Sequence, residues 1–533
     1  MKIVSLLSFV AVILSVCSGA GTPLPQSYTT WYVRPDGGSP EQCTGLVNAP
    51  YPGSGTGQSC AWDHPFRALP PEGEPRIAGG DSLIIAAGNY MMGYGAPGAD
   101  NCDADYPWGC FMAAIPSGPD PTHPTRILGA DDSNPPELWG TERVDLILNL
   151  TDASNVEIAY LEITDHSGCV ESHTGGLRCE RDTFPFGAWA VRGIYAEDSA
   201  NVHLRDLNIH GLASAGVHAG RLTDWTVENV RIAGNGLVGW DGDLWEGSDS
   251  NSGTMRFQRW TVEWNGCGET WPGGQPTGCW GQEAGGYGDG VGTGETGGHW
   301  IIEDSKFLHN TSDGLDLLYA RIPGSFIEIR RTIAEGNDGQ QIKTTGPVLI
   351  ENSIIVGNCG YFDGQPFTYN VEPICRAGGT ALTLDLRPGD QVTVTSSTLA
   401  SEGDCIVAAE CTGNCNGSEK ILLRNNIFMG YTDFLQPDDR ACLAYEETFP
   451  RSPFDIDYSL IDGVKDDACP GPHDICGRPP GLVSTSIDSF DAHLLPTSPA
   501  IDKGTTEGAP RDDFDGQPRD SKPDLGAYER RTP

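Results

Sequence analysis

"NVEIAYLEI" from Asn155 to Ile163 and "NVHLRDLNI" from Asn201 to Ile209 are two copies of one short pattern that decides the fold. Both place apolar residues at alternating or consecutive positions, as β-strands do, and no helical periodicity of comparable length competes with them. The pattern returns along most of the chain, as "DWTVENVRI" from Asp224, "RFQRWTVEW" from Arg256, "HWIIEDSKF" from His299, "FIEIRRTIA" from Phe326, "PVLIENSII" from Pro347, "QVTVTSSTL" from Gln391 and "KILLRNNIF" from Lys420.

The spacing of these strands is that of a repeat protein. Intervals of about 21 to 30 residues, or about twice that, indicate stacked units that cannot bury their apolar faces alone. Leucine-rich repeats need regular leucine spacing and propeller blades need about 40 to 50 residues, so neither fits. Turns such as "IAGNG", "EGNDG" and "IVGNC" separate the strands with Gly, Asn and Asp. We therefore predict an all-β chain folded as a single-stranded parallel β-helix, with long disulfide-tied loops.

The chain begins with the features of a secretory signal over residues 1–20. "MKIVSLLSFVAVILSVCSGAGTP" has one Lys, then apolar residues from Ile3 to about Val16, then small residues ending at Ala20. This apolar run is too short to span a membrane, and no later run reaches about 18 apolar residues. We expect a secreted protein, extracellular or periplasmic, with no membrane span.

Cysteine usage agrees with export. Of the 17 cysteines, Cys17 leaves with the signal, so an even number, 16, remains in a chain bound for an oxidising compartment. Zinc is the alternative, but the spacings are irregular and no matching His pair is present. Disulfides are expected, with their connectivity left open, and several cysteines fall in close pairs: Cys43/Cys60, Cys102/Cys110, Cys169/Cys179, Cys267/Cys279, Cys359/Cys375 and Cys469/Cys476.

The net charge of −40 limits the partners. Nucleic acid and anionic membranes both need a basic surface, so neither is expected. An acidic polysaccharide would be repelled unless bound cations bridge it to the protein. The alternative is that the acidic residues form a solvated shell that keeps the protein soluble, and we expect a monomer.

The repeats divide the chain into four parts. After the signal we predict an N-terminal opening segment and cap over residues 21–140, a β-helix core over 141–440 with a loop insertion at 239–298, and last coils with a closing segment over 441–533. Eight of the 13 tryptophans lie between Trp225 and Trp300. Their flat faces suit sugar rings, although they could equally pack the insertion onto the coil.

Four polar residues lie one repeat apart. Asp313 and Asp316 occur in "HNTSDGLDLLYARIPG", Asp289 lies 24 residues before Asp313, and Lys343 lies 27 residues after Asp316. Residues one coil apart lie above one another, because the strands are in parallel register. We therefore expect three carboxylates and one amine on one face, although Asp-Gly is also an ordinary turn pair and Lys343 an ordinary surface residue.

Such a cluster suits one reaction on sugars. Calcium binds six to eight oxygen ligands, and aspartates supply them. Removing the proton next to a uronic-acid carboxylate needs charge neutralisation, which calcium provides, and a base. Lys343 can be that base if desolvation and a nearby cation lower its pKa. Arg330 or Arg331, one strand away, could contact the substrate carboxylate, although only one of two adjacent strand residues can face the groove.

Two ends and the centre of the chain resemble known proteins. "WYVRPDGG…HPFRALP…GGDSLIIAAGNY" (Trp31 to Tyr90) and "SPAIDKG…DDFDGQPRDSKPDLGAYE" (Ser498 to Glu529) resemble the opening and closing segments of secreted bacterial right-handed parallel β-helix proteins, many of them polysaccharide lyases. The segment from Ser312 to Asp316 is similar to the Asp-Asp-Gly-x-Asp pattern of the family 9 polysaccharide lyases, with Ser312 in place of a carboxylate. This resemblance implies a right-handed coil, calcium at Asp289, Asp313 and Asp316, and Lys343 as base on a pectate-like substrate.

Two other functions stay open. A glycoside hydrolase on the same scaffold would use Asp289 and Asp313 as acid and base, but the Gly-His-Gly and paired-Asp motifs of polygalacturonases are missing. A non-catalytic surface or matrix protein would use the β-helix only to display loops, and the acidic surface and disulfides suit it. The function predicted first is a secreted polysaccharide lyase that cleaves a uronic-acid polymer by calcium-assisted β-elimination.

Overall fold

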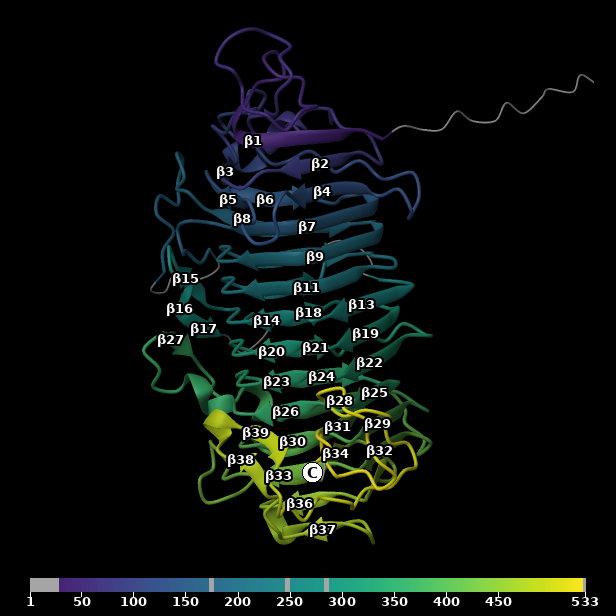
Figure 1. Ribbon diagram of the computed structural model, residues 1–533. Helices are drawn as coiled ribbons and strands as arrows, with labels where there is room; N and C mark the ends of the chain where they lie inside the picture. Colours follow the sequence, from purple (N-terminus) through teal and green to yellow (C-terminus); the bar gives the residue numbers. More distant parts are fainter. Residues whose placement is uncertain (1–27, 172–176, 245–249, 282–286, 531–533) are drawn as a thin grey trace, which may run out of the picture.

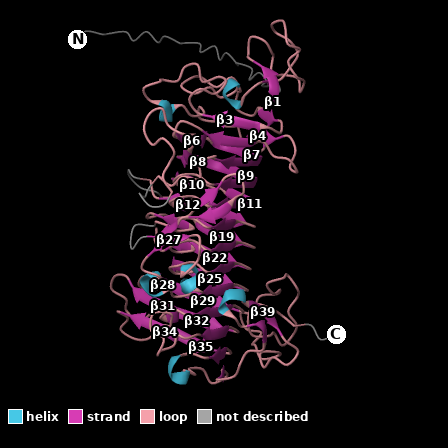
Figure 2. Cartoon of the chain, turned by 90° about the vertical axis from the view of Figure 1, so that its left-hand side faces the viewer, coloured by secondary structure: helices cyan, strands magenta, loops and turns pink. Residues whose placement is uncertain are grey.

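The protein is a right-handed parallel β-helix, as predicted (Figure 1). The computed structural model describes residues 28–171, 177–244, 250–281 and 287–530, so the predicted signal peptide lies outside the described residues. Strands are stacked in a column that starts with β1 and ends with β36 and β37. Figure 2 shows the column from the side, with the longer loops and the short helices on its outside.

Two parallel sheets make up the wall of the column within the described residues. The larger sheet has 23 strands, β1 (Thr30–Gly38), β2 (Ser82–Ile85), β3 (Asn89–Met92), β4 (Thr125–Gly129), β5 (Glu137–Gly140), β7 (Ser154–Thr164), β9 (Ala200–His210), β11 (Thr226–Ala233), β13 (Thr254–Gln258), β14 (Thr261–Glu263), β19 (His299–Glu303), β20 (Lys306–Leu308), β22 (Phe326–Arg330), β23 (Ile333–Glu335), β25 (Val348–Glu351), β26 (Ile354–Gly357), β29 (Gln391–Thr395), β30 (Thr398–Ser401), β32 (Lys420–Arg424), β33 (Ile427–Gly430), β35 (Phe454–Asp457), β36 (Leu460–Asp462) and β37 (Ile475–Cys476).

The second sheet has ten strands and carries the candidate site. In order along the column they are β6 (Val144–Asn149), β8 (Ala190–Glu197), β10 (Ala215–Gly220), β12 (Val238–Gly242), β18 (Val291–Thr293), β21 (Leu315–Leu317), β24 (Ile342–Thr345), β28 (Leu382–Leu386), β31 (Cys405–Cys411) and β34 (Cys442–Glu447). It is called the ten-stranded sheet below.

The remaining elements are small. Three two-stranded pairs consist of β15 (Gly268–Thr270) with β16 (Gln275–Thr277), β17 (Cys279–Gly281) with β27 (Thr368–Val371), and β38 (Leu482–Ser484) with β39 (Asp491–Leu494). The described helices are short 3-10 turns: η1 (Pro65–Arg67), η2 (Pro107–Gly109), η3 (Cys359–Phe362), η4 (Arg376–Gly378), η5 (Lys465–Asp467) and η6 (Ile487–Ser489).

The core is a set of apolar stacks inside the column. In the larger sheet the in-register partners Leu204, Val227 and Phe257 follow one another on β9, β11 and β13, and all three are fully buried. The stack continues through Ile302 and Ile329 on the next two coils. Each such side chain contributes about 1.5–3 kcal/mol by leaving water, which is why the apolar pattern decides the fold.

Most coils of the larger sheet bend at a residue with a left-handed backbone. Tyr160 (φ 60°) lies inside β7 and Asp206 (φ 52°) inside β9. On later coils the same corner separates two short strands, at Asp304 (φ 53°) between β19 and β20 and at Arg331 (φ 45°) between β22 and β23. Non-glycine residues pay about 1–2 kcal/mol for this conformation. The corner therefore fixes where the larger sheet turns.

A ladder of buried amide side chains supports the turn that leads into the ten-stranded sheet. The Nδ2 group of Asn235 donates to Oδ1 of Asn265 at 2.9 Å, Asn265 to Asn310 at 2.9 Å, and Asn310 to Asn337 at 2.8 Å. Asn337 donates to Gln341 at 2.8 Å on the same coil. Because buried amides are costly unless bonded, the ladder holds successive turns in one register.

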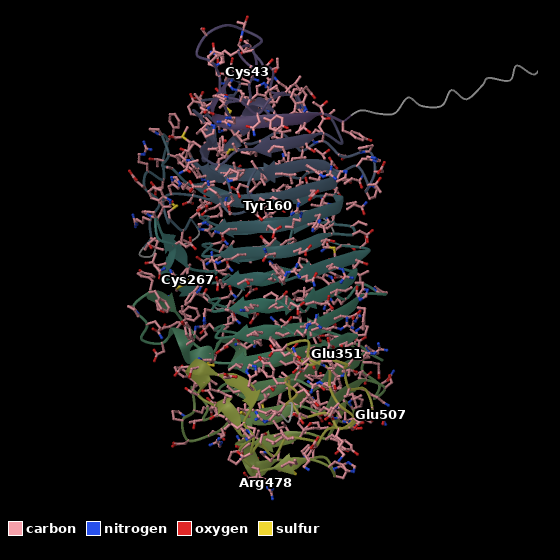
Figure 3. The ribbon with its side chains drawn as sticks, viewed as in Figure 1. Cys43, Tyr160, Cys267, Glu351, Arg478 and Glu507 are labelled. Carbon is pink, nitrogen blue, oxygen red and sulfur yellow. A yellow bond between two sulfur atoms is a disulfide. The ribbon has the colours of Figure 1, made fainter. Side chains whose placement is uncertain are left out.

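Eight disulfides close the loops, which confirms the disulfide prediction. All six pairs that lie close in the sequence are bonded, and Cys405–Cys442 and Cys411–Cys415 complete the set. Cys267, which is bonded to Cys279, lies on the side of the column where the long loops gather (Figure 3). No helix in the described part of the chain is long and apolar enough to cross a membrane.

The described part of the loop insertion is shorter than the predicted range 239–298. Strands β12, β13 and β14 all pair within the two large sheets, so this part of the range belongs to the coil itself. The chain leaves the column after β14 and returns at β18. The β15–β16 hairpin and β17 lie in this excursion, whose described parts are residues 264–281 and 287–290.

The C-terminal segment folds back along the last coils. Leu525 and Tyr528 pack with Ile427 and Leu460 in a separate apolar cluster. The Nδ2 group of Asn352 donates to the carbonyl oxygen of Asp512 at 2.7 Å. In Figure 1 this yellow segment lies beside β33 and β30, so it covers one side of the lower column.

Candidate functional site

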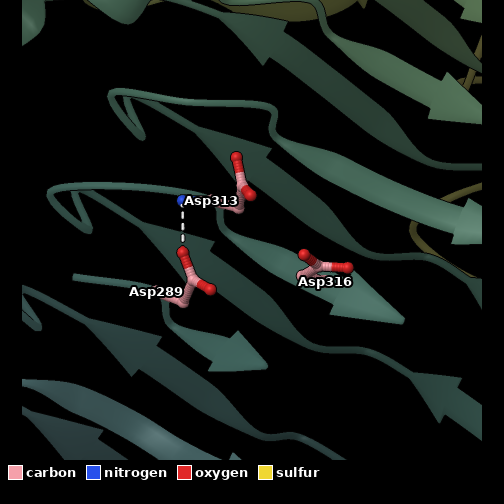
Figure 4. A group of neighbouring side chains, drawn as sticks. All are labelled: Asp289, Asp313 and Asp316. Atoms are coloured by element: carbon pink, nitrogen blue, oxygen red, sulfur yellow. Dashed lines mark hydrogen bonds between the residues drawn. The ribbon is translucent and has the colours of Figure 1, made fainter. Parts of the chain in front are cut away.

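Four of the six predicted site residues meet on three neighbouring strands of the ten-stranded sheet. Asp316 on β21 is directly opposite Lys343 on β24. Asp289 and Asp313 each lie two residues before the start of their strands, β18 and β21. The three aspartates are buried, and oxygens from all three lie within 4.8 Å of one another (Figure 4). Parallel register brings together residues that are far apart in the sequence.

Backbone amides hold one oxygen of each aspartate. The amide of Asp313 donates to Oδ1 of Asp289 at 3.0 Å, and that of Gln340 donates to Oδ1 of Asp313 at 2.8 Å. The amide of Leu318 donates to Oδ1 of Asp316 at 2.8 Å. A Cβ on Gly339 would lie only 2.2 Å from Oδ1 of Asp313, so glycine is needed there for the carboxylate to fit. The second oxygen of each carboxylate is left for other partners.

Two basic side chains, Lys343 and Arg376, lie among the three carboxylates. The Nζ atom of Lys343 is 3.0 Å from Asp316 and 3.3 Å from Asp313. Nη1 of Arg376 is 3.5 Å from Asp313 and 3.7 Å from Asp289, and it also donates to the hydroxyl of Ser312. Arg376 was not among the predicted residues. The cluster therefore contains three acidic and two basic side chains.

Arg376 reaches the cluster from a loop. It follows Cys375, which is bonded to Cys359, in the excursion between β26 and β28. Asp338 lies beside it, because the amide of Cys375 donates to its carboxylate at 3.2 Å. Arg376 has no partner one coil away in the sequence, so repeat spacing gave no signal for it, whereas Asp338 lies 25 residues after Asp313 in the same Asp-Gly pattern. The proximity of Cys359 and Cys375 was the only hint that this loop returns to the column.

Burial and mutual repulsion raise the pKa values of Asp289 and Asp316. Burial, with the charges of Asp313 and Asp316, raises the pKa of Asp289 to about 7. Burial also raises the pKa of Asp316. For Lys343, burial lowers the pKa, but the carboxylates of Asp313 and Asp316 outweigh it, so the pKa lies above its usual value. Without a further cation, Lys343 therefore holds its proton.

The structure does not bring Arg330 and Arg331 to the cluster. Arg330 ends β22 in the larger sheet, where it pairs with Glu351 at 2.9 Å and Glu303 at 3.5 Å. Arg331 is the left-handed corner residue of this coil and pairs with Asp304 at 2.6 Å. The cluster lies on the other sheet, beyond the next turn of the chain.

Most of the described tryptophans in the predicted group are structural. Trp225, Trp240, Trp260 and Trp300 are fully buried in the core, which agrees with the packing interpretation. Trp271, in the excursion, is 51% exposed. Trp245 lies outside the described residues.

The donor set fits a hard divalent cation. Calcium prefers carboxylate and other oxygen ligands, and the three aspartates present oxygens close enough to share one ion. Among the described residues this is the one group of three or more such side chains that converges in this way. The fold and the cluster together define a right-handed parallel β-helix protein with a buried acidic site suited to a cation.

Comparison with known proteins gives structural likeness only. No protein family and no curated protein matches the chain by sequence. Similar solved structures include pectate lyase Pel9A (14% identity, TM-score 0.42, covering 95% of this chain and 97% of that chain), an alginate lyase from Paenibacillus sp. str. FPU-7 (15%, 0.33, 71% and 93%) and a rhamnogalacturonan lyase (13%, 0.30, 92% and 99%). At such identities the residues of the cluster have to carry any functional conclusion.

Proposed function

We propose that the protein is a secreted polysaccharide lyase that cleaves a uronic-acid polymer by calcium-assisted β-elimination. The observation that carries this proposal is the convergence of Asp289, Asp313, Asp316 and Lys343 on three adjacent strands. The amine lies 3.0 Å from one carboxylate and 3.3 Å from another, so a base stands beside the cation ligands, as this reaction requires. A polymer of uronic acids fits both features, because its carboxylates can bind the cation and the carbon next to each carboxylate can lose a proton to the base.

Each side chain has one role in this proposal. Asp289, Asp313 and Asp316 would hold calcium, which when bound would neutralise charge on the substrate carboxylate. Lys343 would accept the proton from the carbon next to that carboxylate. The bond between the neighbouring carbon and the glycosidic oxygen then breaks as the double bond forms, and its electron pair leaves with the oxygen, which takes up a proton from water to become a hydroxyl. Asp313 and Asp316 hold the proton on Lys343 in the structure, so the amine must leave these ion pairs before it can act as base.

Arg376 is better placed than Arg330 or Arg331 to meet the substrate carboxylate. Its guanidinium already lies 3.5 Å from one acidic side chain of the cluster, and a planar guanidinium suits carboxylates. The arginines predicted from sequence are committed to acidic partners on the larger sheet. Arg376 therefore takes the role first expected of them.

The test is an incubation with polygalacturonate, alginate and a rhamnogalacturonan, with calcium or with a chelator. A lyase gives ultraviolet-absorbing unsaturated ends, and only with calcium. Lys343→Ala should lower kcat at least about a hundredfold, the lower end for loss of a general base. Lys306→Ala is the matched control, because Lys306 is an exposed lysine on the larger sheet.

Three results would contradict the proposal. New reducing ends without ultraviolet absorbance would indicate hydrolysis. No product from any polymer would favour a display protein. Activity of Lys343→Ala within about tenfold of the parent would remove Lys343 as the base.

A further inference from the structure

A second pocket lies away from the aspartate cluster, where the excursion covers the column. It has a volume of about 350 Å³ and lies between the ends of β7, β9 and β11 and the β15–β16 hairpin. Its position along the column differs from that of the cluster. His210 leads into β10, whereas Asp313 leads into β21, three strands further along the ten-stranded sheet. At about 4.8 Å per strand this is a separation of about 14 Å along the axis.

The β15–β16 hairpin is held against the column by specific contacts. Glu269 of β15 is buried, and its carboxylate is 2.7 Å from Nδ1 of His210. A Cβ on Gly234 (φ 61°) would lie 2.3 Å from Cγ of Glu269, so the coil has a glycine where this side chain enters. The disulfide Cys267–Cys279 closes the base of the hairpin. The pocket is thus a built feature of the described structure.

Its polar lining offers mainly hydrogen-bond acceptors. His210 lies between Glu269 and Glu162, whose carboxylate is 3.0 Å from Nε2, so both ring nitrogens are engaged. Arg231 donates to Glu263 at 2.7 Å and to Asn208 at 3.2 Å. Ionised carboxylates only accept, and each has several lone-pair sites, so a ligand here has to supply donors.

One wall of the pocket is a supported aromatic surface. The indole of Trp271 is half exposed and stacks on the ring of His166 with centroids 4.2 Å apart. His166 stacks in turn on Trp139 at 4.2 Å, and its Nε2 atom is 2.7 Å from Glu137. The two rings stacked behind Trp271 support its indole, which presents a flat apolar face beside the carboxylates of the pocket. Such a face gives large contact area at a low entropy cost.

We propose that this pocket binds one uncharged sugar unit of a polysaccharide, with its ring face on Trp271 and its hydroxyl groups donating to Glu162 and Glu269. A neutral sugar combines an apolar C–H face with several hydroxyl donors, which matches both walls. A uronic acid would bring another negative charge beside Glu137, Glu162 and Glu269, and the two cations of the lining, Arg231 and His210, are already paired with carboxylates, so it would be disfavoured. The site therefore differs from the aspartate cluster in the sugar that it selects, and it does not depend on the proposed lyase activity.

Calorimetric titration of the full chain with neutral tetrasaccharides tests this proposal. Galacto-, manno-, xylo- and cello-tetraose would be compared with tetragalacturonate, all with a chelator present so that no calcium-dependent reaction contributes heat. At least one neutral sugar should bind with a dissociation constant of about 1 mM or tighter, and tetragalacturonate more weakly. Trp271→Ala should weaken binding about tenfold, and Trp271→Phe should restore most of it.

Tyr106→Ala serves as the matched control, because Tyr106 is an exposed aromatic residue outside the pocket lining. The proposal is overturned if none of the neutral sugars binds, if tetragalacturonate binds best, or if Trp271→Ala binds as the parent does. Binding of simple cations in place of sugars would also overturn it. None of these results bears on ultraviolet-absorbing products from polyuronides, so the two proposals fail separately.

Discussion

Replacing Asn310 by Ala should destabilise the fold at the turn that carries Asp313. The Asn310 side chain is fully buried and makes four hydrogen bonds. Its Nδ2 group donates to Asn337 at 2.8 Å and to the carbonyl of Val262 at 3.2 Å. Its Oδ1 atom accepts from Nδ2 and from the backbone amide of Asn265, at 2.9 and 3.1 Å. At about 1 kcal/mol for each bond, Asn310→Ala should lower the free energy of unfolding by about 4 kcal/mol.

Urea unfolding followed by tryptophan fluorescence measures this loss. Trp260 and Trp300 are fully buried on the coils next to the ladder, so they report on this part of the column. Asn134→Ala is the control, since Asn134 is exposed and should change stability by less than about 0.5 kcal/mol. A loss below about 1 kcal/mol for Asn310→Ala would refute the reasoning, because the buried amides would then not hold the register.

Two further predictions concern charge. Burial lowers the pKa of His210, but hydrogen bonds and charges from Glu162 and Glu269 outweigh burial and raise this pKa to about 9. The protonated ring therefore stabilises the folded protein fully below about pH 6.5, and this stabilisation is lost as the pH rises through about 9. His210→Gln should therefore remove a fall of roughly 2–3 kcal/mol in unfolding free energy between pH 6 and pH 10, and an unchanged fall in urea titrations would contradict the pairing. Ser312→Asp adds a fourth carboxylate beside Asp289 and Asp313, so calorimetric titration should show calcium binding about tenfold tighter, whereas equal or weaker binding would mean that position 312 does not face the ion.

The column could be predicted from sequence because burial largely alternates along strands such as β7 and β9. Ile158 and Leu204 lie on the same inner face of adjacent coils, as their places in "NVEIAYLEI" and "NVHLRDLNI" indicate. The convergence of Asp289, Asp313 and Lys343 followed from the same parallel register, because one repeat in the sequence corresponds to one strand step in space. Repeat geometry alone was enough to place these side chains.

Features without a repeat could not be placed in this way. Arg331 lies at a left-handed corner, and the apolar pattern does not show which residue of a strand pair will bend the chain. Arg376 and Trp271 come from long excursions whose return to the column depends on disulfides and on single contacts such as that of Glu269 with His210. The asparagine ladder did leave a signal, since Asn235 and Asn337 each lie just before a turn glycine or Asp-Gly pair.

Ser312 and Arg376 are best understood together. A carboxylate at position 312 would place a fourth negative charge in a buried site where repulsion and burial already raise the pKa of Asp289 to about 7. Ser312 avoids that charge, and its hydroxyl accepts from Arg376, which also approaches Asp289 and Asp313. With Lys343 the site has two internal cations for three acids, so the buried charge is nearly balanced before any ion binds. Calcium must therefore compete with these side chains, and its binding should be weaker and more dependent on ionic surroundings than in a site of four unpaired carboxylates.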